Sequence, residues 1–424
     1  MSALLELAAR SAWNRRFALG LVVGAIALST LLLLGLERLR QDVRHSFTQA
    51  VSGTDLIVGA RSGPVQLLLS SVFHLGSASN SIRMSSLDSL AKHRAVAWLV
   101  PLRLGDSHRG FVVLGTTAGY FEHVRHGHQQ PLVLAQGRVF DGVFDVVIGA
   151  QVARQLGYRL GQPVVLSHGD GALHTNDHDD KPFTVVGILA PTGTPVDRTL
   201  LTSLQASEAV HLDWAAGIRL PGQHVTAANA AAQAAAADLT PHTANAALVG
   251  LKTRAAVFAV QRDVAAFKAE PLLAILPGVA LDELWTVLAI GERGLQLMGA
   301  LVALVSLAGL VAVILAGLNE RRRELAILRT VGAGPSQVYG LLALEGGLVT
   351  LLGVLLGAAL CWAAVATLGP WLQAQWGISL RLQAPGAAEW QTGGAVLAAG
   401  LLASLLPGWR AYHLSLADGL SPRI

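Results

Sequence analysis

Histidine and aspartate gather in one stretch of the sequence, residues 167–180, which reads SHGDGALHTNDHDD. All but one of the 14 histidines lie between His45 and His242, so this residue type belongs to the middle of the chain. Neutral imidazole nitrogen and carboxylate oxygen are common protein ligands of zinc, and a loop can wrap them around the ion. Zinc is therefore a candidate cofactor, with His168, His174, Asp177 and His178 as the candidate ligands.

A solvated hairpin loop explains the same residues without a metal. The stretch joins two strand-like runs, 163–166 and 183–189, and Gly, Asn and Asp are ordinary turn residues. A second group, His123, His126 and His128 in EHVRHGH, is open to the same two interpretations. The spacing of neither group matches a defined metal site, so the sequence leaves both interpretations open.

Motifs for nucleotide binding and for bond cleavage are absent from the sequence. There is no GxxxxGK[ST] loop, and the nearest segment, residues 250–253, lacks the upstream glycine and has the wrong spacing. HExxH, GxSxG and paired-cysteine patterns are missing as well, and the only cysteine is Cys361. We expect that the chain is not an enzyme and that it binds no nucleotide itself.

The composition points to membrane helices together with one large aqueous region. The chain has 424 residues, of which 52% are hydrophobic and 14% charged. Its net charge of +4 does not indicate nucleic-acid binding, because the arginines are concentrated beside apolar runs.

Four apolar runs are long enough to cross a bilayer, whose hydrocarbon core is about 30 Å thick. They are residues 17–36, 294–318, 338–368 and 392–409. The first could instead be a cleaved signal peptide, but it ends in Leu36-Glu37-Arg38 rather than in a small-residue cleavage site. We interpret it as an uncleaved anchor.

The region between the first and second runs has the pattern of a mixed α/β domain. Strand-like runs at 95–102, 110–114, 163–166 and 183–189 are separated by glycine, proline and polar turns. Residues 145–157 indicate a strand followed by a short helix that ends in glycine. The alanine-rich residues 206–239 are predicted to be helical.

The segment between the second and third runs, residues 319–336, reads NERRRELAILRTVGAGPS. Its charged residues must lie where a membrane helix meets water, and its apolar residues recur at helical spacing until glycine and proline end the helix. The simpler alternative is a charge cluster that only sets the topology.

This segment, with its flanking apolar helices and the early Glu345, resembles the FtsX-like/MacB-like family of ABC transporter permeases. Residues 145–200, with their strand-glycine-helix unit and the run Phe183-Thr-Val-Val-Gly, resemble the extracytoplasmic domain of MacB-like permeases. The resemblance implies a membrane protein with four transmembrane α-helices and a large extracytoplasmic α/β domain between helices 1 and 2. The implied division is 1–37 for an N-terminal amphipathic helix and the first span, 38–292 for the outer domain, and 293–424 for the permease domain.

In that family a short cytoplasmic helix docks on a separate ATPase, which holds the ATP and Mg²⁺. The resemblance therefore implies a coupling helix at 320–334 whose contacts with a cytoplasmic ABC ATPase dimer come from Arg321, Arg322, Arg323, Glu324, Leu325, Leu328 and Arg329. Leu325 and Leu328 are the apolar anchors of this surface, and the charges form its rim.

Further partners follow from the resemblance and from the membrane helices themselves. A second permease copy, identical or paralogous, is expected, and the small-residue pairs Gly20/Gly24 and Gly353/Gly357 are spaced for close helix packing in such a dimer. A periplasmic or lipoprotein partner also fits the family, whereas nucleic acid does not. Glu345 is a functional candidate as a membrane carboxylate, or lies close enough to the interface to reach Arg329 or water.

Three functions compete at this stage, and the third is a membrane enzyme, for which no motif in the sequence argues. The first is a dimeric permease that couples ATP hydrolysis on the partner to motion of the outer domain, for export, extraction or mechanotransmission. The second is a metal- or protein-binding membrane sensor or scaffold with a His-rich outer loop. The transported substrate, the direction of transport and the choice between homodimer and heterodimer do not follow from the sequence.

The arginine positions predict a bacterial inner-membrane protein with both termini in the cytoplasm, because Arg321 to Arg323, Arg329 and Arg410 must share one side. Single cysteines placed near residues 180, 325 and 424 in a Cys361→Ala background test this topology. A membrane-impermeant thiol reagent added to whole cells should label only the position near 180. Labelling near 325 but not near 180 would reverse the topology.

Overall fold

The computed structural model describes residues 16–76, 80–169, 178–212, 214–215, 218–219, 227–320, 330, 332, 334–376, 380 and 382–412. The chain divides into two compact units. The helical unit contains Met1–Asp42, Ala289–Trp371 and Leu380–Ile424. The sheet domain contains Val43–Leu288 together with Leu372–Ser379.

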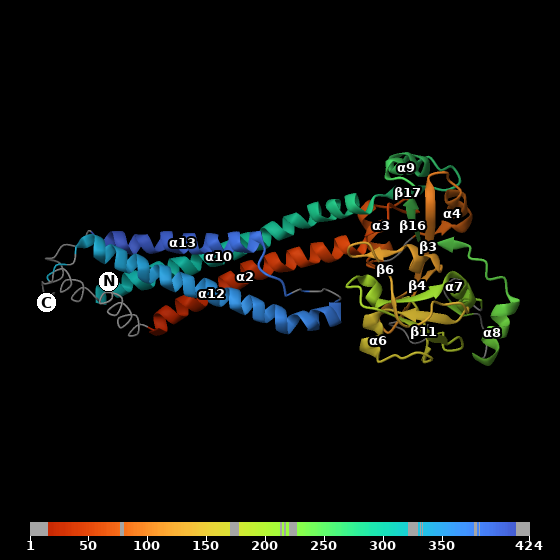
Figure 1. The fold of residues 1–424 in the computed structure, drawn as a ribbon, viewed down its shortest axis with the longest axis horizontal. Coiled ribbons are helices and arrows are strands. Elements are labelled where there is room, and N and C mark those ends of the chain that lie inside the picture. Colours follow the sequence, from red (N-terminus) through yellow and green to blue (C-terminus); the bar gives the residue numbers. More distant parts are fainter. Residues whose placement is uncertain are drawn as a thin grey trace. The chain divides into compact units, whose positions relative to one another are not determined.

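Four long helices carry the four predicted apolar runs (Figure 1). They are α2 (Arg16–Ala50), α10 (Pro277–Glu320), α12 (Pro335–Trp376) and α13 (Ala387–Tyr412). All four are long and apolar enough to cross a membrane. The predicted architecture, with an α/β domain between the first and second spans, is confirmed. The helices are longer than the predicted spans because no glycine or proline stops α2 after Leu36, and α10 begins with a proline at its first turn.

The helical unit is held together by an apolar core to which all four helices contribute. Its buried members are Leu19, Val22, Ile26, Leu307, Leu310, Ile314, Leu318, Val338, Leu342, Val349 and Val396. A buried ionic group joins two of these helices, since Arg38 of α2 lies 3.4 Å from Asp42 and 3.4 Å from Glu389 of α13. Glu345 of α12 is also buried.

The sheet domain is built on an 11-stranded mixed sheet. The strand order is β17-β1-β16-β3-β4-β12-β8-β11-β7, with β10 paired to β3 and β9 paired to β11. Two neighbouring pairs are parallel, β4 with β12 and β8 with β11, and the other pairs are antiparallel. The strands of this sheet are β1 (Leu56–Ala60), β3 (Val96–His108), β4 (Phe111–Thr116), β7 (Leu134–Gly137), β8 (Asp145–Ile148), β9 (Pro163–Val164), β10 (Ser167–His168), β11 (Phe183–Leu189), β12 (Thr199–Ser203), β16 (Ala246–Leu251) and β17 (Leu272–Ile275).

Short helices and two-residue strands complete the sheet domain. The helices are α3 (Pro64–Ser71), α4 (Met84–Ala91), α5 (Gly119–His123), α6 (Ala150–Leu156), α7 (Leu204–Val210), α8 (Ala227–Ala236) and α9 (Val257–Ala265), with 3-10 turns η2 (Pro195–Arg198) and η3 (Arg254–Ala256). The small strands pair as β2 (Ile82–Arg83) with β15 (Thr243–Ala244), β5 (Arg125–His126) with β6 (Gln130–Pro131), and β13 (Trp214–Ala215) with β14 (Ile218–Arg219).

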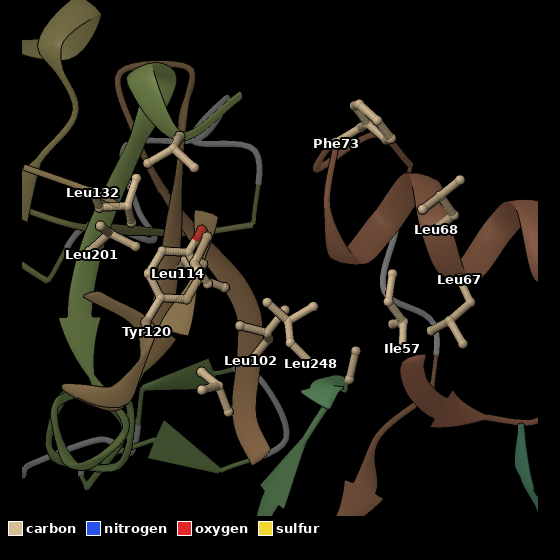
Figure 2. Close-up of a cluster of buried hydrophobic side chains, with 14 of the residues drawn as sticks. Ile57, Leu67, Leu68, Phe73, Leu102, Leu114, Tyr120, Leu132, Leu201 and Leu248 are labelled. Carbon is tan, nitrogen blue, oxygen red and sulfur yellow. The ribbon is translucent and has the colours of Figure 1, made fainter. Parts of the chain in front are cut away.

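Both faces of the sheet are buried. Successive residues of a strand point to opposite faces of the sheet, and here both sets of residues lie in apolar clusters. Leu114, Val147 and Leu201 belong to one apolar cluster, and their chain neighbours Val113, Val146 and Leu200 belong to another. Figure 2 shows part of the first cluster, in which Leu67 and Leu68 of α3 lie near Ile57 of β1. The second cluster includes Ala206 and Val210, which seats α7 on its face of the sheet.

Three local predictions need correction. The strand expected at 95–102 continues to His108, because its second half finds a different partner strand. The strand expected at 163–166 covers only residues 163–164 (β9), and a separate strand, β10, follows at 167–168 and pairs with a different strand. Residues 206–239 are not one helical region, since the hairpin of β13 and β14 separates α7 from α8.

The two glycine pairs have different surroundings within the chain. A Cβ at Gly353 would lie 2.7 Å from the Cβ of Ile26, and one at Gly357 would lie 2.6 Å from the carbonyl oxygen of Ala27. Gly353 and Gly357 thus let α12 approach α2 of the same chain. A Cβ added at Gly20 or Gly24 would meet no atom of the described residues within 4 Å.

Gly357→Leu should force α12 away from α2, because the added side chain meets backbone that cannot give way. Overpacking of this kind typically costs about 1–3 kcal/mol. We expect a lower midpoint of thermal unfolding for the detergent-purified variant, measured by loss of the monodisperse gel-filtration peak. Gly340→Leu, on the same helix at a position with open space, is the matched control and should keep the wild-type midpoint. Equal midpoints for both variants would contradict the packing described.

Candidate metal centre

Four side chains of the sheet domain converge on one point: Asp106, His168, His178 and His211. Their ligand atoms all lie within 4.8 Å of one another. The Nδ1 atom of His168 is 3.1 Å from Oδ1 of Asp106 and 3.1 Å from Nε2 of His211, and the latter two atoms are 3.5 Å apart. In the described part of the chain this is the one such group of His, Cys, Asp and Glu that could hold an ion.

Strand pairing brings Asp106 and His168 together. Strand β10 runs antiparallel to β3, with His168 directly opposite Asp106. The register of β3 against β4 shifts between Leu104 and Asp106, and an irregularity of this type changes the direction in which a strand side chain points. Asp106 is buried, as are Ser107 and His108 after it, whereas Gly105 before it is exposed.

The end of α7 supplies His211, the residue that caps the helix C-terminus. Its Nδ1 lies 2.7 Å from the carbonyl oxygen of Ser207, one helical turn earlier. This hydrogen bond places the proton on Nδ1, so in the neutral ring Nε2 carries a lone pair that faces the cluster. Ser203 starts the helix by accepting a hydrogen bond from the backbone N–H of Ala206 (3.0 Å).

His178 lies where the chain returns toward β11, and its side chain is fully buried. Its backbone N–H donates to the carbonyl of Leu166 (2.8 Å), and its own carbonyl accepts from the N–H of Lys181 (3.1 Å). The buried ammonium of Lys181 donates to the carbonyl of Val210 (2.9 Å), which ties this segment to the end of α7. The three imidazole rings stand nearly perpendicular to one another, with interplanar angles of 80–85°.

Electrostatics favour a charged aspartate among the histidines. Burial raises the pKa of Asp106, but hydrogen bonds from His168 and His211 outweigh this and hold the pKa below its usual range. Burial lowers the pKa of His211, yet the hydrogen bond and the negative charge of Asp106 raise it on balance. Burial lowers the pKa of His178 to about 4, so this ring is neutral at physiological pH. An ionised carboxylate and a neutral imidazole are the forms in which these groups ligate metals.

A cleft of about 470 Å³ reaches the cluster from one side. Asp106, Ser107 and Gly169 line it, as does His74 at the end of α3. The imidazole of His74 contacts the hydroxyl of Thr199 (3.2 Å), and burial lowers the pKa of this imidazole to about 4.

Of the four predicted zinc ligands, two lie in the cluster and two lie outside the described residues. The structure brings His168 and His178 into one cluster, whereas His174 and Asp177 lie outside the described residues. Asp106 and His211 were missed. The strand containing Asp106 was predicted to end at residue 102, and no pattern marked the histidine that follows an alanine-containing helix. The group His123, His126 and His128 forms no such cluster in the part that the structure describes, and the ring of His123 stacks on Trp98 instead.

The predicted ATPase contacts also lie outside the described residues, from Arg321 to Arg329. Between Glu320, the last residue of α10, and Pro335, the first residue of α12, the structure describes only residues 330, 332 and 334.

Comparison with known proteins decides the family. The MacB-like periplasmic core domain matches residues 17–251, and the FtsX-like permease C-terminal domain matches residues 297–416. The chain belongs to the FtsX-like/MacB-like family of ABC transporter permeases. A search of curated proteins found no match.

Two solved structures resemble part of this permease. One is the periplasmic region of MacB from Actinobacillus actinomycetemcomitans, with a TM-score of 0.33, 10% identity, and coverage of 56% of this chain and 97% of that one. The other is the extracellular domain of the noncanonic ABC-type transporter YknZ from Gram-positive bacteria, with a TM-score of 0.30, 13% identity, and coverage of 52% and 99%. The permease is membrane-embedded, and its sheet domain is the MacB-like domain.

The half-buried His74 should make the MacB-like domain of this permease sensitive to acid. Its folded pKa of about 4 lies below the value of 6.5 for the free side chain. Above pH 6.5 the His74 ring is neutral in both the folded and the unfolded chain, so its titration does not lower the free energy of unfolding. As the pH falls from 6.5 to 4, the unfolded chain binds a proton that the folded chain does not, so up to about 3 kcal/mol of stability is lost.

His74→Gln should remove the His74 share of this acid-dependent loss from urea unfolding curves of residues 43–288, recorded with a chelator between pH 7 and 4, and leave the share of His178, whose pKa is also lowered to about 4. Thr199→Val is the matched control, because it removes the hydroxyl contact but keeps the imidazole ring, and it should retain the whole loss. If His74→Gln and the wild type lose the same free energy over this range, the burial argument is wrong.

Proposed function

We propose that this chain is the permease subunit of an ABC transporter, working as a dimer with a separate cytoplasmic ATPase that binds ATP and Mg²⁺. ATP hydrolysis on the partner drives motion of the MacB-like domain for export, extraction or mechanotransmission. The observation that carries this proposal is the family match over both parts of the chain, residues 17–251 and 297–416. No nucleotide-binding motif in the sequence competes with the assignment of ATP hydrolysis to another subunit.

The proposed coupling element is the segment 320–334 between α10 and α12. Two membrane helices flank it, so the segment returns the chain to the bilayer on the side from which it emerged. Its arginines, Arg321 to Arg323 and Arg329, favour the cytoplasmic side. Helix α10 runs unbroken from Pro277 to Glu320, so one continuous helix leads from the MacB-like domain to the coupling segment.

The proposed placement follows from the same charges. The chain lies in the bacterial inner membrane with both termini in the cytoplasm, and the domain of about 38–292 is extracytoplasmic. A second permease copy and a periplasmic or lipoprotein partner complete the proposed assembly. Gly20 and Gly24 of α2 are the small residues left for the contact between copies, because Gly353 and Gly357 contact α2 of their own chain.

The alternative function, a metal- or protein-binding sensor or scaffold, is favoured by one specific observation. The cluster of Asp106 with three histidines is compatible with zinc as a cofactor of the outer domain. The two functions differ in what a partner ATPase does. A permease co-purifies with an ATPase and alters its rate of ATP hydrolysis. A sensor without an ATPase partner is purified without ATP hydrolysis activity.

The proposed docking surface can be tested by charge placed in its apolar ridge. The double substitution Leu325→Asp and Leu328→Asp should release the ATPase from the membrane, because buried apolar anchors supply most of the energy of such an interface, about 2 kcal/mol or more each. Co-purification of the partner ATPase with each variant is the measurement.

Arg321→Ala is the matched control, since a charge at the rim contributes about 0–1 kcal/mol. It should retain the ATPase. Both variants must be present in the membrane at wild-type abundance. If the double Asp variant still retains the ATPase, the docking surface lies elsewhere, for example on the N-terminal residues Leu4 to Leu7.

A further inference from the structure

We propose that Asp106, His168, His178 and His211 form a single four-coordinate site for a divalent transition-metal ion of the zinc class. This ligand set replaces the loop set that the sequence suggested. Two of its members, Asp106 and His211, come from regular elements far from the His-rich stretch. The site is independent of the permease function and can fail or hold without it.

The spacing of the ligand atoms fits a tetrahedral ion. Zinc binds nitrogen and oxygen at about 2.0–2.1 Å, which places neighbouring atoms of a tetrahedron roughly 3.3 Å apart. The three distances among Asp106 Oδ1, His168 Nδ1 and His211 Nε2 are 3.1, 3.1 and 3.5 Å. His178 closes the group from the buried side, with a ligand nitrogen within 4.8 Å of the other three atoms.

The donor types select the class of metal. Three imidazoles and one carboxylate suit zinc and its neighbours in the first transition row. Calcium requires six to eight oxygen ligands and magnesium a near-octahedral oxygen shell, and neither is offered here. Four protein ligands complete a tetrahedral shell, as in structural zinc sites, whereas a catalytic zinc keeps one position open for water. We therefore assign a structural role to the ion rather than hydrolysis.

The protein already orients the ligands. The Ser207 carbonyl holds the Nδ1 proton of His211, which fixes the tautomer with Nε2 toward the site. Such outer contacts usually accompany metal-binding histidines and change affinity about 10–100-fold when they are removed. Strand pairing sets His168 opposite Asp106, and backbone hydrogen bonds at Leu166 and Lys181 hold the segment of His178.

An ion at this point joins chain segments that are distant in sequence. It links β3 to β10, to the chain after residue 177 and to the end of α7. Polar contacts that already hold α7 to this region include the ion pair of Arg103 with Glu208 and the hydrogen bond from Lys181 to Val210. The ion adds a further link at the helix C-terminus, so metal binding should raise the unfolding temperature of the domain.

The first experiment uses Co²⁺ as a probe of coordination number. The full chain is purified in detergent without a polyhistidine tag, stripped with a chelator and titrated with Co²⁺. Four-coordinate Co²⁺ absorbs visible light far more strongly than six-coordinate Co²⁺. We expect one Co²⁺ per chain with the intense spectrum, displaced by one equivalent of Zn²⁺. A wild-type chain that shows no saturable binding, or only the weak six-coordinate spectrum, overturns the proposal.

Ligand variants identify the residues. Asp106→Asn and His211→Ala should each weaken binding by more than about 100-fold, since removal of a ligand exceeds the loss from an outer contact. His93→Ala is the matched control, because His93 also lies beside a carboxylate, Asp263 at 3.2 Å, but outside the cluster. It should bind as the wild type does. Wild-type affinity in His211→Ala, or loss confined to His174→Ala and Asp177→Ala, overturns the ligand set.

A variant that keeps a ligand separates metal binding from misfolding. His211→Cys should still bind Co²⁺ and should add a near-ultraviolet band from thiolate-to-cobalt charge transfer. The wild type lacks this band because its only cysteine, Cys361, lies in α12 outside the sheet domain. The band is a direct sign that position 211 contacts the ion. Co²⁺ binding by His211→Cys without the band would exclude position 211 from the site.

Discussion

The sheet domain depends on one strand that changes its partner part-way along its length. The first half of β3 pairs with β16, and the second half pairs with β4 and β10. One continuous backbone therefore joins the two parts of the sheet, and each has its own buried clusters. The register of β3 against β4 shifts where β3 has taken its new partner, between Leu104 and Asp106. The same strand that holds the domain together thereby directs a carboxylate into its interior.

The helical unit obeys a different constraint, since backbone groups in lipid must bond within their own segment. Helices satisfy this requirement individually, but they gain little from the hydrophobic effect when they associate in lipid. Close packing must take its place, and Gly353 and Gly357 permit it between α12 and α2. The buried charge of Arg38 is compensated, because Asp42 and Glu389 lie beside it.

Features that depend on local composition could be predicted from the sequence, and features that depend on distant pairing could not. Run length and hydropathy suffice for the four spans, and alternation suffices for β11 at Phe183–Leu189. The ends of α2 and α10 could not be read from hydropathy, because helix continues where the apolar run stops. The ligand set shows the same limit. His168 and His178 are ten residues apart in the sequence, whereas Asp106 joins them only through the pairing of β3 with β10, and His211 only through the seating of α7.

The position of the cluster constrains how a metal could matter to a permease. All four ligands belong to the sheet domain, and none comes from the helices that cross the membrane. An ion there changes the free energy of the domain itself, and by linkage it can alter a transport cycle only if two states of the domain bind it differently. Ligands fixed by strand pairing and by a helix end leave little room for such a difference. The cluster is therefore better suited to holding the MacB-like domain rigid than to sensing or carrying the ion.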